Sequence, residues 1–378
     1  MDATLLTTPS FWAASEPFSF GKFTARLPDD GSLDGSVLFE TSGSTGKPKW
    51  IVISKTALLA SASAVNQHLE VSPSSCWGLA LPQHHVGGFG VAARAYSAGC
   101  RFENFSQRWD ASAFAAWIEN KRVSHCSLVP TQVHDLVRLR LRAPAHLRAI
   151  VVGGGHLDVA IGQSARDLGW PVLASYGMTE AASQIATQGL EALGSHYQAA
   201  PIPLLPVWQA RVTTHELLEI SGPALFAGHL NLSTDGAAVY SPLASPWFLT
   251  SDRVRLEGNL LTPLGRADEL VKVLGELVDP EHIERELRAL SRGALAVGTF
   301  AVLAIPDARA GQRLVPIFEK KNSPDIVSAA LAQYALTAPG FRRLQPPHWL
   351  DAIPKSPLGK ILRGDLAASY MAQTSRNS

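Results

Sequence analysis

The chain has 378 residues, 46% of them hydrophobic and 17% charged, and this composition excludes a disordered protein and suits two or three folded domains. Its formal net charge of +1 offers no electrostatic attraction to nucleic acid or to an anionic membrane, so neither is an expected partner. Because its three cysteines are widely spaced and it opens without a secretory signal, we expect a cytoplasmic protein with no disulfide scaffold and no cysteine-based zinc site.

Short apolar runs alternate with amphipathic stretches between glycines and prolines, which favours an α/β fold. The first two predicted strands, 37–40 and 50–53, are joined by a polar turn. Ser54 is positioned to cap a helix that extends to His68. A further buried strand is predicted over 76–81.

A strand–helix–strand unit is predicted in the middle of the chain. The apolar run 147–152 ends in three glycines, an amphipathic stretch at 156–168 follows, and a second apolar run covers 171–175. Such a unit gives parallel strands with a right-handed crossover. The segments after the two strands are therefore expected at the same edge of the sheet.

After a predicted hairpin at 248–261, the pattern changes to a mixture of strands and helices that is large enough to form a small domain. Its first helix is expected to begin at Asp279-Pro280, with Pro280 at the first helical position. Its other elements are predicted at 300–305, 314–319 and 324–336. We place the domain boundary next to Asp268.

The turn between the first two strands suits a polyphosphate. It consists of Thr41, Ser42, Gly43, Ser44, Thr45, Gly46, Lys47, Pro48 and Lys49. The glycines let backbone amides approach an anion, the hydroxyls donate hydrogen bonds and the lysines add positive charge. The turn is not a Walker A loop, because its glycines are too close together and proline follows the first lysine. A plain polar hairpin loop is the alternative, since the same residue types dominate turns.

Glycine-rich and polar segments follow both strands of the strand–helix–strand unit. They are Gly153, Gly154 and Gly155 after the first strand, and Ser175, Tyr176, Gly177, Met178, Thr179 and Glu180 after the second. Glycines would let a flat base lie against the backbone, an aromatic ring offers the base a second face, and a carboxylate is a hard ligand for Mg²⁺. Tight turns are the alternative. The dinucleotide fingerprint does not fit, which excludes a nicotinamide dehydrogenase.

Two more polar segments lie near the domain boundary and near the C-terminus. In the segment 250–252, Asp252 ends a predicted strand and can accept both hydroxyls of a ribose, while Arg266 can reach ribose or phosphate oxygens. The loop 354–363 presents Lys360 between prolines and a glycine. In isolation, an exposed turn and a solvated basic tail are the simpler interpretations.

Taken in order, five segments together resemble the motifs of the adenylate-forming superfamily, which includes acyl-CoA synthetases, peptide-synthetase adenylation domains and luciferases. These segments are 41–49, 176–180, 250–252, 265–275 and 354–360. Within the superfamily, the segments 81–88 and 176–187 look most like o-succinylbenzoate–CoA ligases of menaquinone or phylloquinone biosynthesis. The continuation Ser183-Gln184-Ile185 is the more discriminating part.

The resemblance implies a two-step reaction. A carboxylate attacks the α-phosphate of ATP to give an acyl-adenylate, and the thiol of coenzyme A then displaces AMP. ATP, Mg²⁺, coenzyme A and a small carboxylic acid are the implied ligands, and a homodimer is a further expectation. The implied fold is a large α/β domain over 1–266, with parallel-rich sheets and a shortened beginning, and a small α+β domain over 267–378 on a hinge at Asp268.

The resemblance also implies a role for each matching residue. The turn 41–49 would hold the β- and γ-phosphates; Gly154, Gly155, Ser175, Tyr176 and Gly177 would surround the adenine; Thr179 would contact the α-phosphate; Glu180 would bind Mg²⁺; Asp252 and Arg266 would hold the ribose. Lys360 would bridge the acyl oxygen and the phosphate during adenylation. Rotation at the hinge would then bring Lys272 and Gly275 over the acyl-adenylate, with Gly275 lining the pantetheine tunnel.

Choice of acid is expected to depend on three residues. His85 matches the gate of the acyl pocket, Arg94 matches a basic position that could pair with a second carboxylate, and Ser183 lies in the discriminating segment. A structural histidine and a surface arginine are the alternatives. At the level of the whole protein, the rivals are a synthetase for another aromatic or dicarboxylic acid and a non-catalytic adenylate-binding homologue. Retention of Glu180 and Lys360 argues against the second rival.

Overall fold

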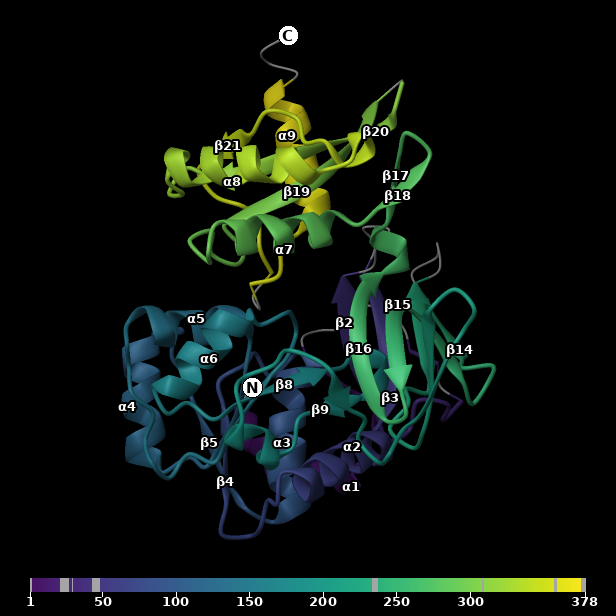
Figure 1. Ribbon diagram of the computed structural model, residues 1–378. Helices are drawn as coiled ribbons and strands as arrows, with labels where there is room; N and C mark the ends of the chain where they lie inside the picture. Colours follow the sequence, from purple (N-terminus) through teal and green to yellow (C-terminus); the bar gives the residue numbers. More distant parts are fainter. Residues whose placement is uncertain are drawn as a thin grey trace. The chain divides into compact units, whose positions relative to one another are not determined.

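The computed structural model describes residues 2–20, 27–28, 30–42, 48–232, 237–307, 309–356 and 359–374 (Figure 1). The chain divides into two compact units, one of Met1–Thr250 with Val254–Pro263 and the other of Ser251–Arg253 with Leu264–Ser378. Within the described ranges, every helix is too short or too polar to span a bilayer.

A six-stranded, mostly parallel sheet forms the centre of the first unit. Its strand order is β5-β4-β6-β7-β8-β9, and the β8–β9 pair is antiparallel. Its strands are β4 (Cys76–Leu79), β5 (Arg101–Asn104), β6 (His125–Leu128), β7 (Ala149–Val152), β8 (Val172–Tyr176) and β9 (Ala186–Thr187). Strands β4, β6 and β7 are buried along their whole length, as expected where helices cover both faces.

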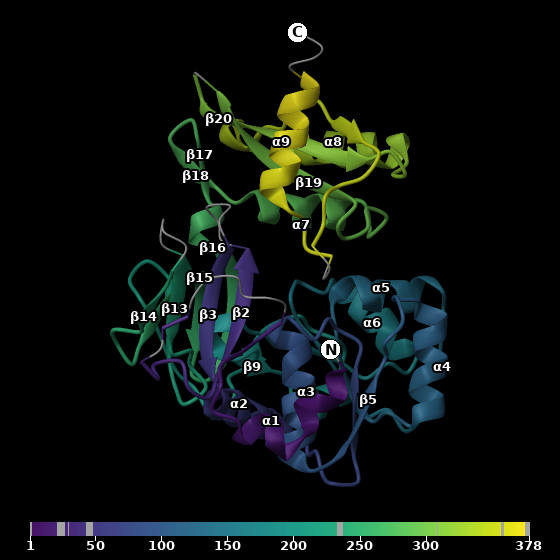
Figure 2. The same ribbon diagram turned by 180° about the vertical axis from the view of Figure 1, so that it is seen from behind.

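Five helices pack around this sheet. They are α2 (Lys55–His68), α3 (Val86–Ala98), α4 (Ala111–Lys121), α5 (Pro130–Arg138) and α6 (Val159–Asp167). The connection from β4 runs towards β5, whereas the later connections run the opposite way. Right-handed crossovers therefore place α3 on one face and α4, α5 and α6 on the other (Figures 1 and 2). The direction reverses between β4 and β6, and α/β sheets bind ligands at the carboxyl ends of the strands at such a point.

Two five-stranded sheets complete the strands of this part of the chain. The first has the order β1-β2-β3-β13-β14, with β1 (Phe18–Ser19), β2 (Ser36–Ser42), β3 (Pro48–Ser54), β13 (Gly228–Leu232) and β14 (Ala238–Pro242). The second has the order β10-β16-β15-β12-β11, with β10 (Ile202–Pro203), β11 (Gln209–Val212), β12 (Leu217–Ser221), β15 (Phe248–Glu257) and β16 (Leu260–Arg266). Apart from the parallel β1–β2 pair, the pairings that the structure describes in these two sheets are antiparallel.

The N-terminal segment is held against α2 by a buried lysine. It contains the 3₁₀ helix η1 (Ala3–Thr7) and the short helix α1 (Pro9–Ala13). Lys55 Nζ donates to the carbonyl oxygens of Phe11 and Ala14 at 2.8 and 2.6 Å, and it lies 4.8 Å from the centroid of the Phe11 ring. The segment thereby covers apolar core that would otherwise face water.

The second unit contains a three-stranded sheet, β19-β20-β21, with helices on both faces, and a separate two-stranded sheet, β17-β18. Its strands and helices are β17 (Val271–Val273), β18 (Glu276–Val278), β19 (Phe300–Asp307), β20 (Gly311–Glu319), β21 (His348–Leu350), α7 (Pro280–Leu290), α8 (Pro324–Thr337) and α9 (Arg363–Thr374), with the 3₁₀ helices η4 (Ala267–Glu269) and η5 (Gly340–Arg342). Helices α7 and α8 lie on one face of the three-stranded sheet and α9 on the other (Figures 1 and 2). Alternate residues of β19 face opposite sides: Phe300 and Val302 pack with α7 and α8, while Ala301 and Leu303 pack with α9.

The elements expected from the sequence are largely confirmed. The first two predicted strands agree with β2 and β3, which pair antiparallel, and Ser54 caps α2 through a bond from the Ala57 amide at 3.1 Å. The α/β class with a parallel-rich sheet is confirmed as well. Several boundaries were wrong. For example, the strand at 76–81 ends at Leu79, the helix expected from 156 begins at Val159 because Asp158 accepts the first free amides, and the strand expected from 314 begins at Gly311.

Candidate active site

The glycine-rich and polar segments that were expected at one edge of the sheet do lie side by side there. Val152 pairs with Leu128 on one side and with Ala174 on the other, so the residues that follow β7 and β8 are level with one another. A Cβ atom on Gly153 would lie 3.8 Å from the Ser175 carbonyl oxygen. Gly154 and Gly155 are exposed, and Gly154 has a φ of 75°, a conformation that favours glycine.

The turn after β8 is held by close backbone packing. A Cβ atom on Gly177 would collide with the Ser183 carbonyl oxygen, so this position requires glycine. The Ser175 hydroxyl lies 3.2 Å from the Ala186 carbonyl oxygen and accepts or donates a bond with Thr187 Oγ1 at 3.0 Å. The result is an exposed backbone edge at Gly177 beside the half-buried Tyr176 ring, which suits a flat base.

Thr179 and Glu180 lie in the 3₁₀ helix η2 (Thr179–Ala181), directly after this turn. The Phe226 amide donates to the Glu180 carbonyl oxygen at 2.8 Å, which fixes the backbone that carries the carboxylate. Among the described residues there is no group of three or more His, Cys, Asp or Glu side chains that could hold a metal ion. A single carboxylate fits Mg²⁺, because this ion is commonly held by one or two carboxylates together with substrate phosphates.

The predicted phosphate turn is described only at its two ends. Thr41 pairs with Lys49 across β2 and β3, and its hydroxyl donates to the Lys49 carbonyl oxygen at 3.1 Å. The Lys49 side chain is exposed. Ser42 belongs to β2, while Gly43, Ser44, Thr45 and Gly46 lie outside the described residues, so their predicted role stays a prediction.

Arg94 is the most unusual side chain at this edge of the sheet. It is only 1% exposed, and no carboxylate of the described residues pairs with it. Its guanidinium donates to the hydroxyls of Ser127 at 3.1 Å and Ser183 at 3.3 Å, it lies 5.2 Å from the Trp77 ring, and its Nε has no partner. Burial lowers the pKa of Arg94 to about 9. The alternative of a surface arginine was therefore wrong.

The backbone around Arg94 is shaped to admit it. A Cβ atom on Gly90, one helical turn earlier in α3, would lie 3.1 Å from the Arg94 guanidinium and 3.6 Å from Ser183 Cβ. Ser183 itself has a φ of 107°, which is rare for a residue with a side chain. A constrained backbone therefore brings its hydroxyl to the guanidinium.

His85 precedes the first residue of α3, after the carboxyl end of β4. Its Nε2 is buried and has no hydrogen-bond partner, and its ring lies 4.4 Å from the ring of His84. Burial, together with the neighbouring His84, lowers the pKa of His85 to about 4, so the ring is neutral at physiological pH. A neutral ring with an unpartnered Nε2, beyond the carboxyl end of β4, is compatible with the predicted gate at an apolar acyl group.

Two residues close to these segments were not predicted from the sequence. Ser127 contacts Arg94 from near the end of β6, a short strand that no apolar run in the sequence marks. His229 of β13 lies opposite Ile51, its ring is 4.9 Å from Phe226, and its Nδ1 is buried without a partner. Burial and the charge of Lys49 lower its pKa.

In the second unit, Arg266 joins the predicted ribose ligand to the predicted hinge residue. It donates to Asp252 at 3.2 Å and grips both oxygens of Asp268, at 2.8 and 2.7 Å. The hydrogen bond to Asp268 and the charges of Asp252, Asp268 and Glu269 raise the pKa of Arg266 further above its ordinary value, against the effect of burial. The same partnership lowers the pKa of Asp268.

The other predicted residues of the second unit are exposed. Lys272 lies on β17, and Leu274 and Gly275, with φ of 54° and 88°, form the two-residue turn to β18. Both φ values are positive, as a tight hairpin turn of this kind requires, so the turn geometry by itself favours glycine at position 275. Lys360 has an exposed side chain, and its charge helps to lower the pKa of Asp268.

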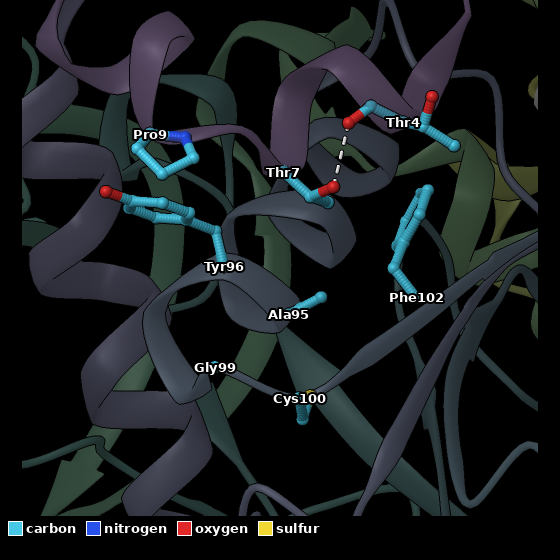
Figure 3. A pocket seen from close by; sticks show the side chains of 8 residues that line it. All are labelled: Thr4, Thr7, Pro9, Ala95, Tyr96, Gly99, Cys100 and Phe102. Atoms are coloured by element: carbon cyan, nitrogen blue, oxygen red, sulfur yellow. Dashed lines mark hydrogen bonds between the residues drawn. The ribbon is translucent and has the colours of Figure 1, made fainter.

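A separate hollow of about 400 Å³ lies at the opposite edge of the parallel sheet, where α3 ends and β5 begins (Figure 3). It is lined by Thr4, Thr7, Pro9, Ala95, Tyr96, Gly99, Cys100 and Phe102. The Thr7 hydroxyl donates to the Thr4 carbonyl oxygen at 2.8 Å, so this polar group is already satisfied. The hollow includes none of the predicted site residues.

Comparison with known proteins identifies relatives for most of the chain. A profile of the AMP-binding enzyme family matches residues 14–213. The chain is 33% identical over 290 residues to 2-succinylbenzoate–CoA ligase of Salmonella typhimurium, covering 77% of this chain and 59% of the relative. It is 31% identical over 355 residues to a probable 2-succinylbenzoate–CoA ligase of Mycobacterium tuberculosis, covering 90% of this chain and 86% of the relative.

Two solved structures share the fold. A variant of E. coli MenE with bound OSB-AMS matches with a TM-score of 0.72 and 26% identity, covering 89% of this chain and 69% of that chain. The o-succinylbenzoate CoA synthetase of Bacillus subtilis in complex with the acyl-adenylate intermediate OSB-AMP also matches with a TM-score of 0.72, at 24% identity, covering 87% of this chain and 68% of that chain.

Proposed function

The chain belongs to the AMP-binding enzyme family, and we propose that it is an ATP-dependent acid–CoA ligase whose substrate is o-succinylbenzoate. In the first step, a carboxylate oxygen of the acid attacks the α-phosphate of ATP, and pyrophosphate leaves. In the second step, the thiol of coenzyme A attacks the acyl carbon, AMP leaves and a thioester forms. Such a ligase would serve menaquinone or phylloquinone biosynthesis.

The observation that carries this proposal is the buried guanidinium of Arg94. Burying a charge without a counter-ion is unfavourable, and here hydroxyls and an aromatic face are its partners. An acid with a second carboxylate would supply the missing negative charge, and a guanidinium can bind that carboxylate through two hydrogen bonds. o-Succinylbenzoate has two carboxylates, so one can pair with Arg94 while the other reacts.

The remaining residues divide the work of the first step. The exposed backbone at Gly154, Gly155 and Gly177 and the ring of Tyr176 would hold the adenine, with Ser175 at its edge, while the turn 41–49 binds the terminal phosphates. Thr179 would donate to the α-phosphate. Glu180 would hold Mg²⁺, which neutralises phosphate charge when it is bound.

The second unit would supply the other groups. Asp252 would accept the ribose hydroxyls beside Arg266, and Lys360 would stabilise the negative charge that develops between the acyl oxygen and the α-phosphate. After adenylation, rotation at Asp268 would withdraw Lys360 and present Lys272 and Gly275 to the acyl-adenylate.

The direct test is detection of o-succinylbenzoyl-CoA by mass spectrometry after incubation with ATP, Mg²⁺, coenzyme A and the free acid. Omission of coenzyme A should leave the acyl-adenylate as the product. Pyrophosphate release can also be measured with a panel of aromatic monoacids and other dicarboxylic acids. This comparison distinguishes o-succinylbenzoate from the substrates of related synthetases. Nucleotide binding without pyrophosphate release on any acid would contradict the ligase assignment and indicate a non-catalytic adenylate-binding protein.

A cytoplasmic location and a homodimer belong to the same proposal. Cell fractionation tests the first, and size-exclusion chromatography with light scattering tests the second.

A further inference from the structure

The loop that carries Lys360 is fastened at its start by a buried carboxylate. Glu319, at the end of β20, is 3% exposed. Its Oε1 accepts the Ile353 amide at 3.0 Å and Lys355 Nζ at 3.0 Å, while its Oε2 pairs with Lys321 at 2.6 Å. One carboxylate thus fixes both the backbone and a side chain where the loop begins.

A second buried carboxylate fastens the end of the same loop. Glu284 of α7 is 7% exposed and accepts the Val302 amide at 2.7 Å and the Arg363 guanidinium at 2.9 Å. Arg363 also donates to the Val302 carbonyl oxygen at 3.2 Å and to Glu281 at 3.2 Å. Arg363 is the first residue of α9, so this network fixes the junction between the loop and the helix.

Hydrogen bonds donated by backbone amides close the loop between the two fastenings. The Ser356 amide donates to the Lys360 carbonyl oxygen at 2.8 Å, the Lys360 amide donates to Ser356 Oγ at 3.2 Å, and the Leu362 amide donates to the Pro354 carbonyl oxygen at 3.0 Å. The Lys360 side chain, by contrast, is exposed. Its flexible stem therefore starts from a backbone that is held on both sides.

We propose that Glu284 and Glu319 are positioning residues for Lys360, each acting through the loop rather than by touching substrate. The inference rests on the adenylation role proposed above for Lys360. An ammonium on a four-carbon stem can be placed reproducibly only if its Cα is fixed. A displacement of about 1 Å at a reacting group can lower a rate roughly 100-fold, so loosening either fastening should be felt in the step that uses Lys360.

The test compares Glu284→Gln and Glu319→Gln with the wild type in each half-reaction. We expect acyl-adenylate formation to slow by about 10- to 100-fold, mainly in kcat, and less than in Lys360→Ala, for which loss of a transition-state donor predicts roughly 100- to 1000-fold. Thioester formation from preformed acyl-adenylate and coenzyme A should stay within about 2-fold, because Lys360 is not used there. Glutamine keeps the size of the side chain, and two separate variants guard against a folding failure in one of them.

Glu286→Gln is the matched control. Glu286 lies on the same helix as Glu284 and also pairs with an arginine, Arg342, at 2.6 Å, but it makes none of the loop contacts. Both half-reactions should be unchanged in this variant. Equal losses in the two half-reactions of Glu284→Gln and Glu319→Gln, or no loss in either, would show that the carboxylates only stabilise the fold and would overturn the inference.

Hydrogen exchange at the Ile353 and Leu362 amides separates this inference from the proposed function. We expect about 10-fold faster exchange at Ile353 in Glu319→Gln and at Leu362 in Glu284→Gln, with no change in Glu286→Gln. Unchanged exchange would overturn the fastening even in an active enzyme. Faster exchange in a protein whose wild type forms no acyl-adenylate would support the fastening and contradict the proposed function.

Discussion

Among the residues at the carboxyl ends of the parallel strands, the buried Arg94 carries most of the proposed substrate assignment. Arg94 has donors to spare, since its Nε is unpartnered and its described partners are two hydroxyls and a ring. The lowered pKa shows that burial disfavours its charged form, and a bound carboxylate would relieve this. Binding of an anionic ligand by Arg94 is therefore part of the proposed function.

Replacing Arg94 should therefore affect dicarboxylic acids selectively. Arg94→Ala is expected to raise KM for o-succinylbenzoate by about 10- to 100-fold, because a hydrogen-bonded charge contributes roughly 1.5–3 kcal/mol. The KM of a benzoate-like monoacid should hardly change. Steady-state kinetics on both acids provide the measurement, and Arg101→Ala, at an exposed ion pair with Glu103, is the control. An equal loss on both acids would contradict the assignment of Arg94 to the second carboxylate.

Burial of His125 makes the folded state less stable at acidic pH. It is fully buried against Trp77, its Nδ1 lies 2.8 Å from Ser124 Oγ, and burial lowers its pKa from 6.5 to about 4. In this range the unfolded chain binds a proton that the folded chain does not, so stability falls as pH decreases from 6.5 to about 4 and then levels. The loss from this group is on the order of 3 kcal/mol.

The check on His125 is urea unfolding of the wild type and of His125→Asn between pH 7 and pH 4. Asparagine places a nitrogen near the Nδ1 position but does not titrate. The variant should lose less stability over this range than the wild type does, with the difference accumulating below pH 6.5. His85, whose pKa is also lowered, remains in both proteins and cancels in the comparison. Parallel pH profiles would contradict the argument.

At the scale of elements, the backbone of the turn between β8 and η2 positions several of the predicted site residues. Gly177 lies against the Ser183 carbonyl, so Gly177→Ala must push apart the segments that carry Tyr176, Glu180 and Ser183. We expect a loss of stability of about 1–3 kcal/mol from overpacking, together with weaker ATP binding. Thermal unfolding and calorimetry measure the two effects.

The control for that turn is Gly194→Ala, at the end of the 3₁₀ helix η3 (Leu190–Gly194). A Cβ atom there would meet nothing within 4 Å, so stability and ATP binding should both be retained. If Gly177→Ala behaved like this control, close packing under the turn would not be what positions Glu180.

Local sequence patterns predicted those elements that are marked by a helix-start residue or by a continuous apolar run. Ser54 caps α2 as its position suggested, Pro280 is the first residue of α7 as expected, and the apolar runs at β7 and β8 form adjacent parallel strands. Long-range contacts were not predictable in this way. The bonds from Lys55 to Phe11 and Ala14, and the fastening of a C-terminal loop by Glu284, join residues tens of positions apart and leave no local periodicity.

The same difference between local patterns and long-range contacts applies to the site. Resemblance to a family singled out Arg94, but its burial and its contact with Ser127 depend on how α3 packs over β6, which no spacing in the sequence encodes. Segments after successive parallel strands were predictable as neighbours, because topology alone brings their carboxyl ends to one edge.

At the scale of the whole molecule, the proposed reaction needs the second unit to act twice, once with Lys360 and once with Lys272 and Gly275. The two faces lie on different parts of that unit, Lys360 on the loop before α9 and Gly275 on the β17–β18 turn. Because Lys360 and Gly275 are carried by different segments, the proposal includes a change in backbone torsion near Asp268 that presents them to the acyl-adenylate in turn.

Asp268→Pro tests this change directly. Proline fixes φ near −65° and disfavours the helical conformation of Ala267, which now lies in η4, so rotation at this point should be hindered. We expect thioester formation to slow by about 10- to 100-fold and acyl-adenylate formation to change much less, because only the second step follows the rotation. Rapid-quench measurement of each half-reaction gives the two rates.

Asp268→Ala separates the torsion from the ion pair. It removes the two bonds to Arg266, at 2.8 and 2.7 Å, yet leaves φ free to change. If the Arg266–Asp268 ion pair only stabilises one backbone conformation at Asp268, the alanine variant should keep or increase the rate of thioester formation, while the proline variant should lower it. The hinge assignment would be contradicted if proline slowed both half-reactions equally, or if alanine reproduced the effect of proline. Asp268 would then be only an ion-pair partner of Arg266, and the hinge would lie elsewhere in the chain.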